Sequence, residues 1–401
     1  MEEWKEYRLG DFMEFNPKIS LKKETVARKI TMDQLVPHSR DIYSWTYEPY
    51  SGGAKFQNGD TIMARITPCL ENGKHAFISL LDENEIAYGS TEYIVIRGRK
   101  GISDNLFVYY LTHFPSFKDA AIKSMVGTSG RQRAQVDVLE NLTMKLPSIA
   151  EQKSIADILT KLDDKIAVNK QINDNLEQEA QALFKSWFVD FEPFKNGDFV
   201  ESELGMIPKG WRVGSIYDYI DVVYGAPYKS SLFNDKKEGL PLIRIRDLKT
   251  NAPQFYTPEI LPNTEFVKAG DIVAGMDAEF IPYVWLGEKG VLNQRCCKFR
   301  GKNEAISNYY ILFLIKPELE YVQSYKTGTT VSHLGKSDID RFRFVTPPLD
   351  VVKSFSDLVD GMLKELVNRA NESRCLAELR DTLLPKLMSG ELKVNEIEDV
   401  L

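Results

Sequence analysis

Two stretches of the chain, 200 residues apart, share one pattern of apolar and polar positions. Apolar residues recur in both at alternating spacings of three and four, which is typical of a coiled-coil seam rather than of an ordinary surface helix. The pattern predicts helices over residues 150–188 and 350–388. The first seam is Leu159, Leu162, Ile166, Asn169, Asn173, Leu176, Ala180, Leu183 and Trp187, and the second is Val359, Met362, Leu366, Arg369, Ser373, Leu376, Arg380, Leu383 and Leu387.

Two such helices in one chain most simply pack on each other, in antiparallel order. Both seams turn polar near their middle, where Asn169 and Asn173 would face Arg369, Ser373 or Arg380. Polar residues at such positions fix the register of a helix pair at some cost in stability. The alternative is that these side chains tilt toward solvent or toward a partner subunit.

The repeat extends beyond the helices into the segments before them. Each segment combines short β-branched and aromatic runs, such as 92–96, with a helical pattern at 104–112 or 308–315. Strand-like runs are also expected at 30–32 and 243–245. The matched pairs are Trp4 with Trp211, Gly59-Asp60 with Gly270-Asp271, and Gly127-Thr128 with Gly328-Thr329.

This organisation predicts an α+β fold of two pseudo-repeated heads separated by two long antiparallel coiled-coil helices. The predicted domains are a first head at 1–149, a first spacer helix at 150–190, a second head at 191–349, and a second spacer helix with a tail at 350–401. The acidic tail after Gly390 is expected to fray.

Composition narrows the class of protein. The 401 residues are 43% hydrophobic and 27% charged, as in a folded soluble protein, and the N-terminus has no apolar signal core. The net charge of −7 lies in the helical segments, because each head has equal numbers of acidic and basic residues. Four cysteines without zinc or redox spacing predict free thiols in a reducing cytoplasm.

Motifs at the junction between the first head and its helix carry a family resemblance. Gly127-Thr128, Leu146-Pro147 and Glu151-Gln152, followed by Ile155-Ala156 and Leu162-Asp163, resemble the conserved region of type I restriction-modification specificity (S) subunits. The second half is similar in Gly328-Thr329 and Pro347-Pro348, but Val351-Val352 replaces Glu-Gln.

The resemblance implies a DNA-recognition subunit without chemistry of its own. Its heads would be target recognition domains that each read one half of a split, asymmetric site in double-stranded DNA. The helices would set the spacing and dock two modification (methyltransferase) subunits, which carry S-adenosylmethionine. Restriction/translocase subunits would join this complex, and the chain itself would need no cofactor or metal.

Candidate DNA contacts follow from flexible loops and basic residues. The loop at 127–133 offers backbone amides and two guanidinium groups, which suit phosphates and guanine edges. A solvated or salt-bridged surface role is the alternative for each residue. The candidates are Arg65, Lys74, Thr128, Arg131 and Arg133 in the first head, and Lys236, Arg244, Arg246, Lys326 and Lys336 in the second.

The chain has none of the sequence motifs of an enzyme. Thr346-Pro347-Pro348-Leu349 lacks the polar leader and the aromatic residue of an adenine methyltransferase tetrapeptide. There is no glycine-rich phosphate loop and no Gly-x-Ser-x-Gly elbow, and the four histidines have no metal-ligand spacing. This favours a recognition subunit. The alternative from another class is a protein-interaction scaffold that does not bind DNA.

Overall fold

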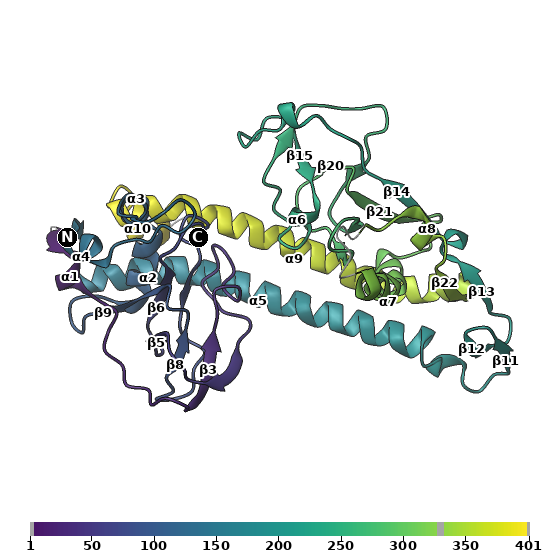
Figure 1. Ribbon diagram of the computed structural model, residues 1–401, viewed down its shortest axis with the longest axis horizontal. Helices are drawn as coiled ribbons and strands as arrows, with labels where there is room; N and C mark the ends of the chain where they lie inside the picture. The colour runs from purple at the N-terminus through teal and green to yellow at the C-terminus, as the bar shows by residue number, and fades with distance from the viewer. Residues whose placement is uncertain (1–3, 327–332, 399–401) are drawn as a thin grey trace. The chain divides into compact units, whose positions relative to one another are not determined.

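The computed structural model describes residues 4–326 and 333–398. The chain divides into two compact units, one formed by residues 1–168 and 374–401 and the other by residues 169–373. Both units mix strands and helices, which confirms the α+β class (Figure 1). Two long helices, α5 (Ile149–Phe188) and α9 (Leu349–Ser389), contribute one half to each unit.

The first unit contains two four-stranded sheets. One is antiparallel, in the order β2-β9-β6-β7, and the other has the order β4-β3-β8-β5, with β3 and β8 parallel. The strands are β1 (Lys5–Arg8), β2 (Met13–Phe15), β3 (Val26–Ile30), β4 (Thr46–Pro49), β5 (Ala54–Phe56), β6 (Thr61–Ala64), β7 (His75–Phe77), β8 (Ala87–Gly89), β9 (Tyr93–Gly98) and β10 (Thr143–Leu146). The helices are α1 (Leu9–Phe12), α2 (Asn105–His113), α3 (Pro115–Lys123), α4 (Val136–Asn141) and α10 (Val394–Glu398).

The second unit repeats this topology. Its sheets have the orders β14-β21-β18-β19 and β16-β15-β20-β17, and β15 and β20 are again parallel. The strands are β11 (Phe199–Ser202), β12 (Gly205–Pro208), β13 (Arg212–Ser215), β14 (Ile220–Tyr224), β15 (Leu240–Ile243), β16 (Tyr256–Thr257), β17 (Phe266–Val267), β18 (Ile272–Gly275), β19 (Pro282–Val284), β20 (Gly290–Leu292), β21 (Cys296–Gly301) and β22 (Arg343–Thr346). The helices are η1 (Glu192–Phe194), η2 (Ile216–Asp218), η3 (Ser230–Leu232), α6 (Ile245–Leu248), α7 (Asn308–Lys326) and α8 (Lys336–Ile339).

The structure corrects several local predictions. The expected strands at 30–32 and 243–245 end at Ile30 and Ile243, because a turn follows β3 and α6 begins at Ile245. The helix predicted at 308–315 continues to Lys326. The tail after Gly390 does not simply fray: α10 forms, and Leu392 and Val394 pack against the core of the first unit.

Within each unit, the halves of α5 and α9 are antiparallel and share a core with the head. In the second unit, Ala180, Phe184 and Leu366 lie in one hydrophobic cluster with α7 and the sheets. In the first unit, Leu159 and Leu387 belong to the same cluster as α2. The helices are therefore core elements of both units. All eighteen seam positions are buried or half-buried, including the polar ones.

The polar centre of the seam forms direct contacts between the helices. Asn169 is fully buried, and its amide donates to Glu372 Oε2 at 2.8 Å and to Ser373 Oγ at 3.3 Å. Arg369 Nη1 donates to Asn169 Oδ1 at 3.1 Å. Asn173 Nδ2 donates to the carbonyl of Leu366 at 3.3 Å. Asn169 therefore points into the helix interface rather than toward solvent, and these directional bonds favour one register.

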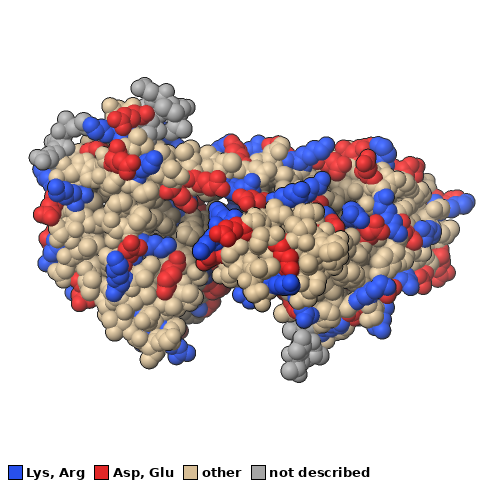
Figure 2. Space-filling model, turned by 90° about the horizontal axis from the view of Figure 1, so that it is seen from above, with Lys and Arg blue, Asp and Glu red and all other residues tan. Residues whose placement is uncertain are grey.

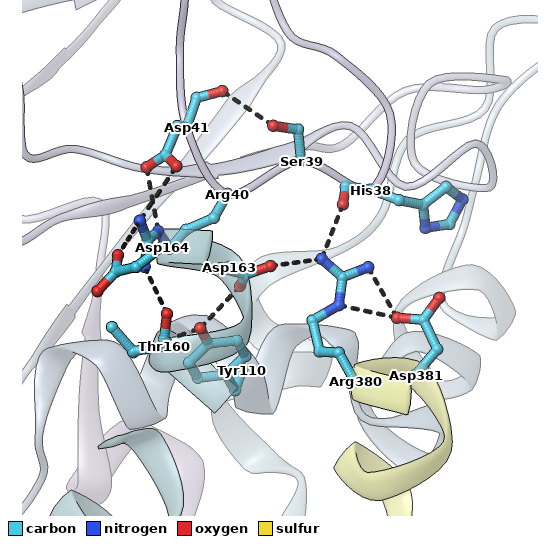
Figure 3. Close-up of polar contacts among 10 residues, drawn as sticks. All are labelled: His38, Ser39, Arg40, Asp41, Tyr110, Thr160, Asp163, Asp164, Arg380 and Asp381. Atoms are coloured by element: carbon cyan, nitrogen blue, oxygen red, sulfur yellow. Dashed lines mark hydrogen bonds and ion pairs between the residues drawn. The ribbon is translucent and has the colours of Figure 1, made fainter. Parts of the chain in front are cut away.

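Arg380 lies elsewhere, in a buried ion-pair network of the first unit (Figure 3). Its Nη1 atom lies 2.6 Å from Asp163 Oδ1 and donates to the carbonyl of His38 at 3.2 Å. Asp163 also accepts a 2.7 Å hydrogen bond from the hydroxyl of Tyr110. Asp163 and Arg380 come from α5 and α9, so one carboxylate and one guanidinium tie both helices to the head.

Arg40 extends this network along α5. Its guanidinium binds Asp41 at 3.0 Å and Asp164 at 2.7 Å, and it reaches the carbonyl of Thr160 at 3.5 Å (Figure 3). The loop at 38–41 is thereby held against the helices by charged side chains. The second unit has Leu363 and Ala180 at the positions that correspond to Asp163 and Arg380, so its contact there is apolar.

We expect Arg380→Met to destabilise the first unit, because it leaves the Asp163 carboxylate buried without its cation. Loss of one partner of a buried ion pair costs about 3–5 kcal/mol. Urea unfolding should show this loss, and hydrogen exchange should accelerate at residues 38–41 and 160–164. Lys386→Met, at an exposed position of α9, is the matched control. Equal unfolding free energies for the two variants would contradict the role assigned to the network.

Candidate nucleic-acid interface

Backbone hydrogen bonds hold the base of the predicted DNA-binding loop of the first head, and we call this set of bonds the loop frame. Val126 and Arg133 exchange backbone hydrogen bonds of 3.1 and 3.0 Å, which closes the loop at its base. The segment after β6 holds this base, because Thr67 N donates to the carbonyl of Gln132 and Ala134 N donates to the carbonyl of Arg65. The loop tip, including Thr128 and Arg131, is exposed.

The guanidinium of Arg133 is already paired within the head. It binds the Glu92 carboxylate through Nε at 2.9 and 3.0 Å and through Nη2 at 2.6 Å. The hydrogen bond from Arg133 lowers the pKa of Glu92 and keeps it ionised. A fixed carboxylate beside a half-exposed guanidinium presents an acceptor and donors to a ligand at the base of the loop.

The remaining candidates in the first head are partly engaged in backbone contacts. Arg65 Nη2 donates to the carbonyl of Ala134 at 3.0 Å, and Lys74 Nζ donates to the carbonyl of Met32 at 2.7 Å. Arg65 nevertheless lies at the frame, since its amide donates to the carbonyl of Glu92 at 2.9 Å. The structure therefore brings Arg65 and Arg133 together, whereas Lys74 braces the turn after β3.

The second head contains the same frame with different side chains. Leu334 N donates to the carbonyl of Met276, as Ala134 N does to that of Arg65 in the first head. Met276 N in turn donates to the carbonyl of Arg295, as Arg65 N does to that of Glu92. The bridge between Ile66 and Arg133 likewise corresponds to that between Asp277 and His333. The predicted Gly328-Thr329 motif lies outside the described residues.

Side chains at equivalent positions of the two frames differ, and at one position the charge is reversed. Arg295 stands where the first head has Glu92, and His333 stands where it has Arg133. Asp277 Oδ2 lies 3.3 Å from Arg295 Nε, and Asp277 Oδ1 lies 2.6 Å from His333 Nδ1. Each head therefore presents its own set of donors and acceptors on a shared backbone. Sequence reasoning missed Glu92, Asp277 and Arg295, although aligning the two repeats by strand would have paired Glu92 with Arg295.

The other predicted residues of the second head are scattered. Lys326 donates to Asp338 and to the carbonyl of His333, so it supports the frame. Arg244 is paired with Asp247 at 3.1 Å and stacks over Phe255. The three remaining predicted residues are exposed: Lys236, Arg246 and Lys336. Of these, Lys336 Nζ lies 3.5 Å from Asp340 Oδ2.

No single sign of charge dominates the face in view in Figure 2, where Lys and Arg are interspersed with Asp and Glu. This agrees with the neutral balance of each head in the sequence. Recognition by such heads depends on the local placement of donors and acceptors rather than on a broad basic surface.

The structure also brings together two histidines that are far apart in sequence. His75 and His113 have ring centroids 4.6 Å apart in the core of the first head. Both Nε2 atoms are buried and have no hydrogen-bond partner among the described residues. Burial lowers the pKa of His75 to about 3 and holds that of His113 well below its ordinary value. Both rings are therefore neutral core groups at neutral pH.

The fold and the paired frames define a protein with two pseudo-repeated recognition heads, and comparison with known proteins gives its family. The type I restriction modification DNA specificity domain matches residues 1–178 and 189–372, and the chain belongs to this family. It is a DNA specificity subunit of a type I restriction-modification system with two recognition domains.

Several relatives share this description. The chain is 29% identical over 316 residues to the type I restriction enzyme MjaIX specificity subunit of Methanocaldococcus jannaschii, covering 73% of this chain and 70% of the relative. It is 24% identical to the HindI specificity subunit of Haemophilus influenzae, covering 98% of this chain and 100% of the relative. The crystal structure of the type I S subunit from M. genitalium is similar in fold, with a TM-score of 0.53, 14% identity and 96% coverage of both chains.

Within the described residues, no helix has the length and apolar character needed to cross a lipid bilayer.

We expect acid to destabilise the first unit through His75 and His113. An unfolded histidine has a pKa of about 6.5, whereas the folded values are lower, so the unfolded chain binds protons first as the pH falls. This contribution to stability is complete above about pH 6.5 and is lost progressively as the pH falls toward about 3.

The measurement is the urea midpoint at successive pH values, for the wild type and for His113→Gln. The midpoint of the variant should fall less steeply below pH 6.5, because one buried base has been removed. Parallel curves for the two proteins would show that the histidine pair does not contribute.

Proposed function

We propose that each head reads a different half of one split, asymmetric site in double-stranded DNA. The observation that carries this proposal is the shared loop frame with different side chains, Glu92 and Arg133 in one head against Arg295 and His333 in the other. Equal backbones place equivalent side chains against DNA in the same way. Different side chains at those positions select different bases.

We also propose that α5 and α9 act as the ruler for the gap between the half-sites and as the docking surface for two methyltransferase subunits. A helix of 40 residues, the length of α5, is about 60 Å long at 1.5 Å per residue. Half-sites read from one face of DNA need a separation of about 34–36 Å or a multiple of it. The helix is therefore long enough to determine a spacing of one DNA turn.

In this proposal the chain supplies recognition and no catalysis. The family and the lack of enzyme motifs in the sequence support this proposal. S-adenosylmethionine would be held by the methyltransferase partners, and restriction/translocase subunits would join the complex in the cytoplasm.

The test of this function is to express the chain with its methyltransferase partner and map the modified adenines in host DNA. We expect one bipartite motif whose two halves differ in sequence. Purified complex should protect the same motif in footprinting at physiological salt. Modification without a preferred motif, or equal binding to all duplexes, would reject the proposal.

The ruler predicts the effect of changing helix length. Inserting seven residues into each helix near its centre keeps the heptad pattern. We expect the modified motif to have a different gap while the bases of both halves stay the same. Altered bases with an unchanged gap would show that the helices do not set the spacing.

A further inference from the structure

A second candidate site lies beside the loop frame, in the first head. A cavity of about 470 Å³ is lined by the segment after β2, by β5 and by the start of β9. Three of its lining side chains are cationic, and none of the described lining residues is acidic. The cationic residues are Lys18, Lys55 and Arg65, and Thr91 and Tyr93 line the cavity as well.

These cations form no direct ion pair among the described residues, although Arg65 interacts with Glu92 at longer range. Among the described residues, no carboxylate lies within ion-pair distance of Lys18, Lys55 or Arg65. Lys55 lies 5.8 Å from the ring centre of Tyr50, and Arg65 uses one nitrogen on the carbonyl of Ala134. The nearby Glu92 is already bound by Arg133.

Arg65 also has an unsatisfied donor. Its Nε atom is buried and has no hydrogen-bond partner among the described residues. Buried donors without partners are costly unless a ligand or water satisfies them.

The second head has different residues at two positions that line this cavity in the first head. The pairing of β5 with β8 and of β17 with β20 aligns Ala54 with Glu265. The pairing of β6 with β9 and of β18 with β21 aligns Val95 with Lys298. Ala54 and Val95 line the cavity of the first head, whereas their counterparts are charged.

In the second head those counterparts form a buried ion pair. Lys298 Nζ lies 2.8 Å from Glu265 Oε1 and 3.0 Å from Asp271 Oδ2, and its side chain is 9% exposed. The positive charge of Lys298 is therefore neutralised by carboxylates of the second head itself. In the first head these two positions are uncharged, and the three cations that line the cavity form no direct ion pair among the described residues.

We propose that this cavity of the first head binds a phosphate group, and that its ligand in the assembled complex is a backbone phosphate of the bound DNA. The second part rests on the proposed function. Three cations, one of them with an unsatisfied Nε donor, match the charge and the acceptor oxygens of a phosphodiester. Such a contact positions the duplex against the neighbouring loop without reading sequence.

The first arm of the test measures DNA binding by the complex with its methyltransferase partner, on a duplex that carries the modified motif. Lys18→Gln/Lys55→Gln should weaken binding roughly tenfold and reduce the slope of log affinity against log salt by about 0.9, the contribution of one phosphate contact. Preference among base substitutions in the motif should not change. Lys100→Gln, an exposed lysine in the turn after β9, is the control.

A second variant tests the cavity itself. Ala54→Glu introduces the acid that the second head has at this place, and it should neutralise the cations and reduce affinity and salt slope in the same way. Circular dichroism and the melting temperature verify that both variants fold. If the folded variants bind the motif with wild-type affinity and slope, the DNA ligand is rejected while the proposed function stands.

The second arm uses inorganic phosphate without DNA. Phosphate should raise the melting temperature of the wild-type chain more than an equal ionic strength of chloride does, and the Lys18→Gln/Lys55→Gln variant should lose this difference. A phosphate effect without any change in DNA binding would identify a free anion as the ligand. Absence of both effects would overturn the site, whether or not the complex selects a DNA motif.

Discussion

The packing of α5 and α9 into the cores of the heads is the interaction on which the rest of this structure depends. Phe184 of α5 contacts the rings of Tyr310, Phe313 and Phe355, so one side chain joins both long helices to α7. In the first unit, Leu159 and Leu387 serve the same purpose. Burial of aromatic and aliphatic surface is the main favourable term in folding, so neither head could release the helices without losing its own core.

Polar contacts add specificity to this apolar packing. Burial of Asn169 and of the Asp163–Arg380 pair costs desolvation free energy. Their directional bonds are satisfied only when α5 and α9 align in one register. A seam made only of leucine would tolerate sliding by a heptad. Under the proposed role of the helices as a ruler, their register has a functional as well as a structural consequence.

The two heads show how duplication separates scaffold from recognition. Sheet order, the parallel pair in the second sheet and the loop frame are the same in both, because they depend on backbone hydrogen bonds and core volume. The side chains at the frame and at the neighbouring cavity differ in charge: Glu92 against Arg295, and neutral Ala54 and Val95 against Glu265 and Lys298. These side chains differ while the backbone frame is kept, which is the property that a family of DNA-reading subunits requires.

The sequence by itself determined the duplication, the α+β class, both long helices and their seam, because heptad spacing and paired motifs are local signals. It also indicated the family, through the Gly-Thr and Leu-Pro motifs that precede the first long helix. Only the tertiary structure decided which basic residues meet: Arg133 lies against Glu92, Arg244 against Asp247, and Lys18 near Lys55 and Arg65 around one cavity. Such pairs lie on separate strands and loops, and their juxtaposition follows from strand pairing, which no local pattern of residues encodes.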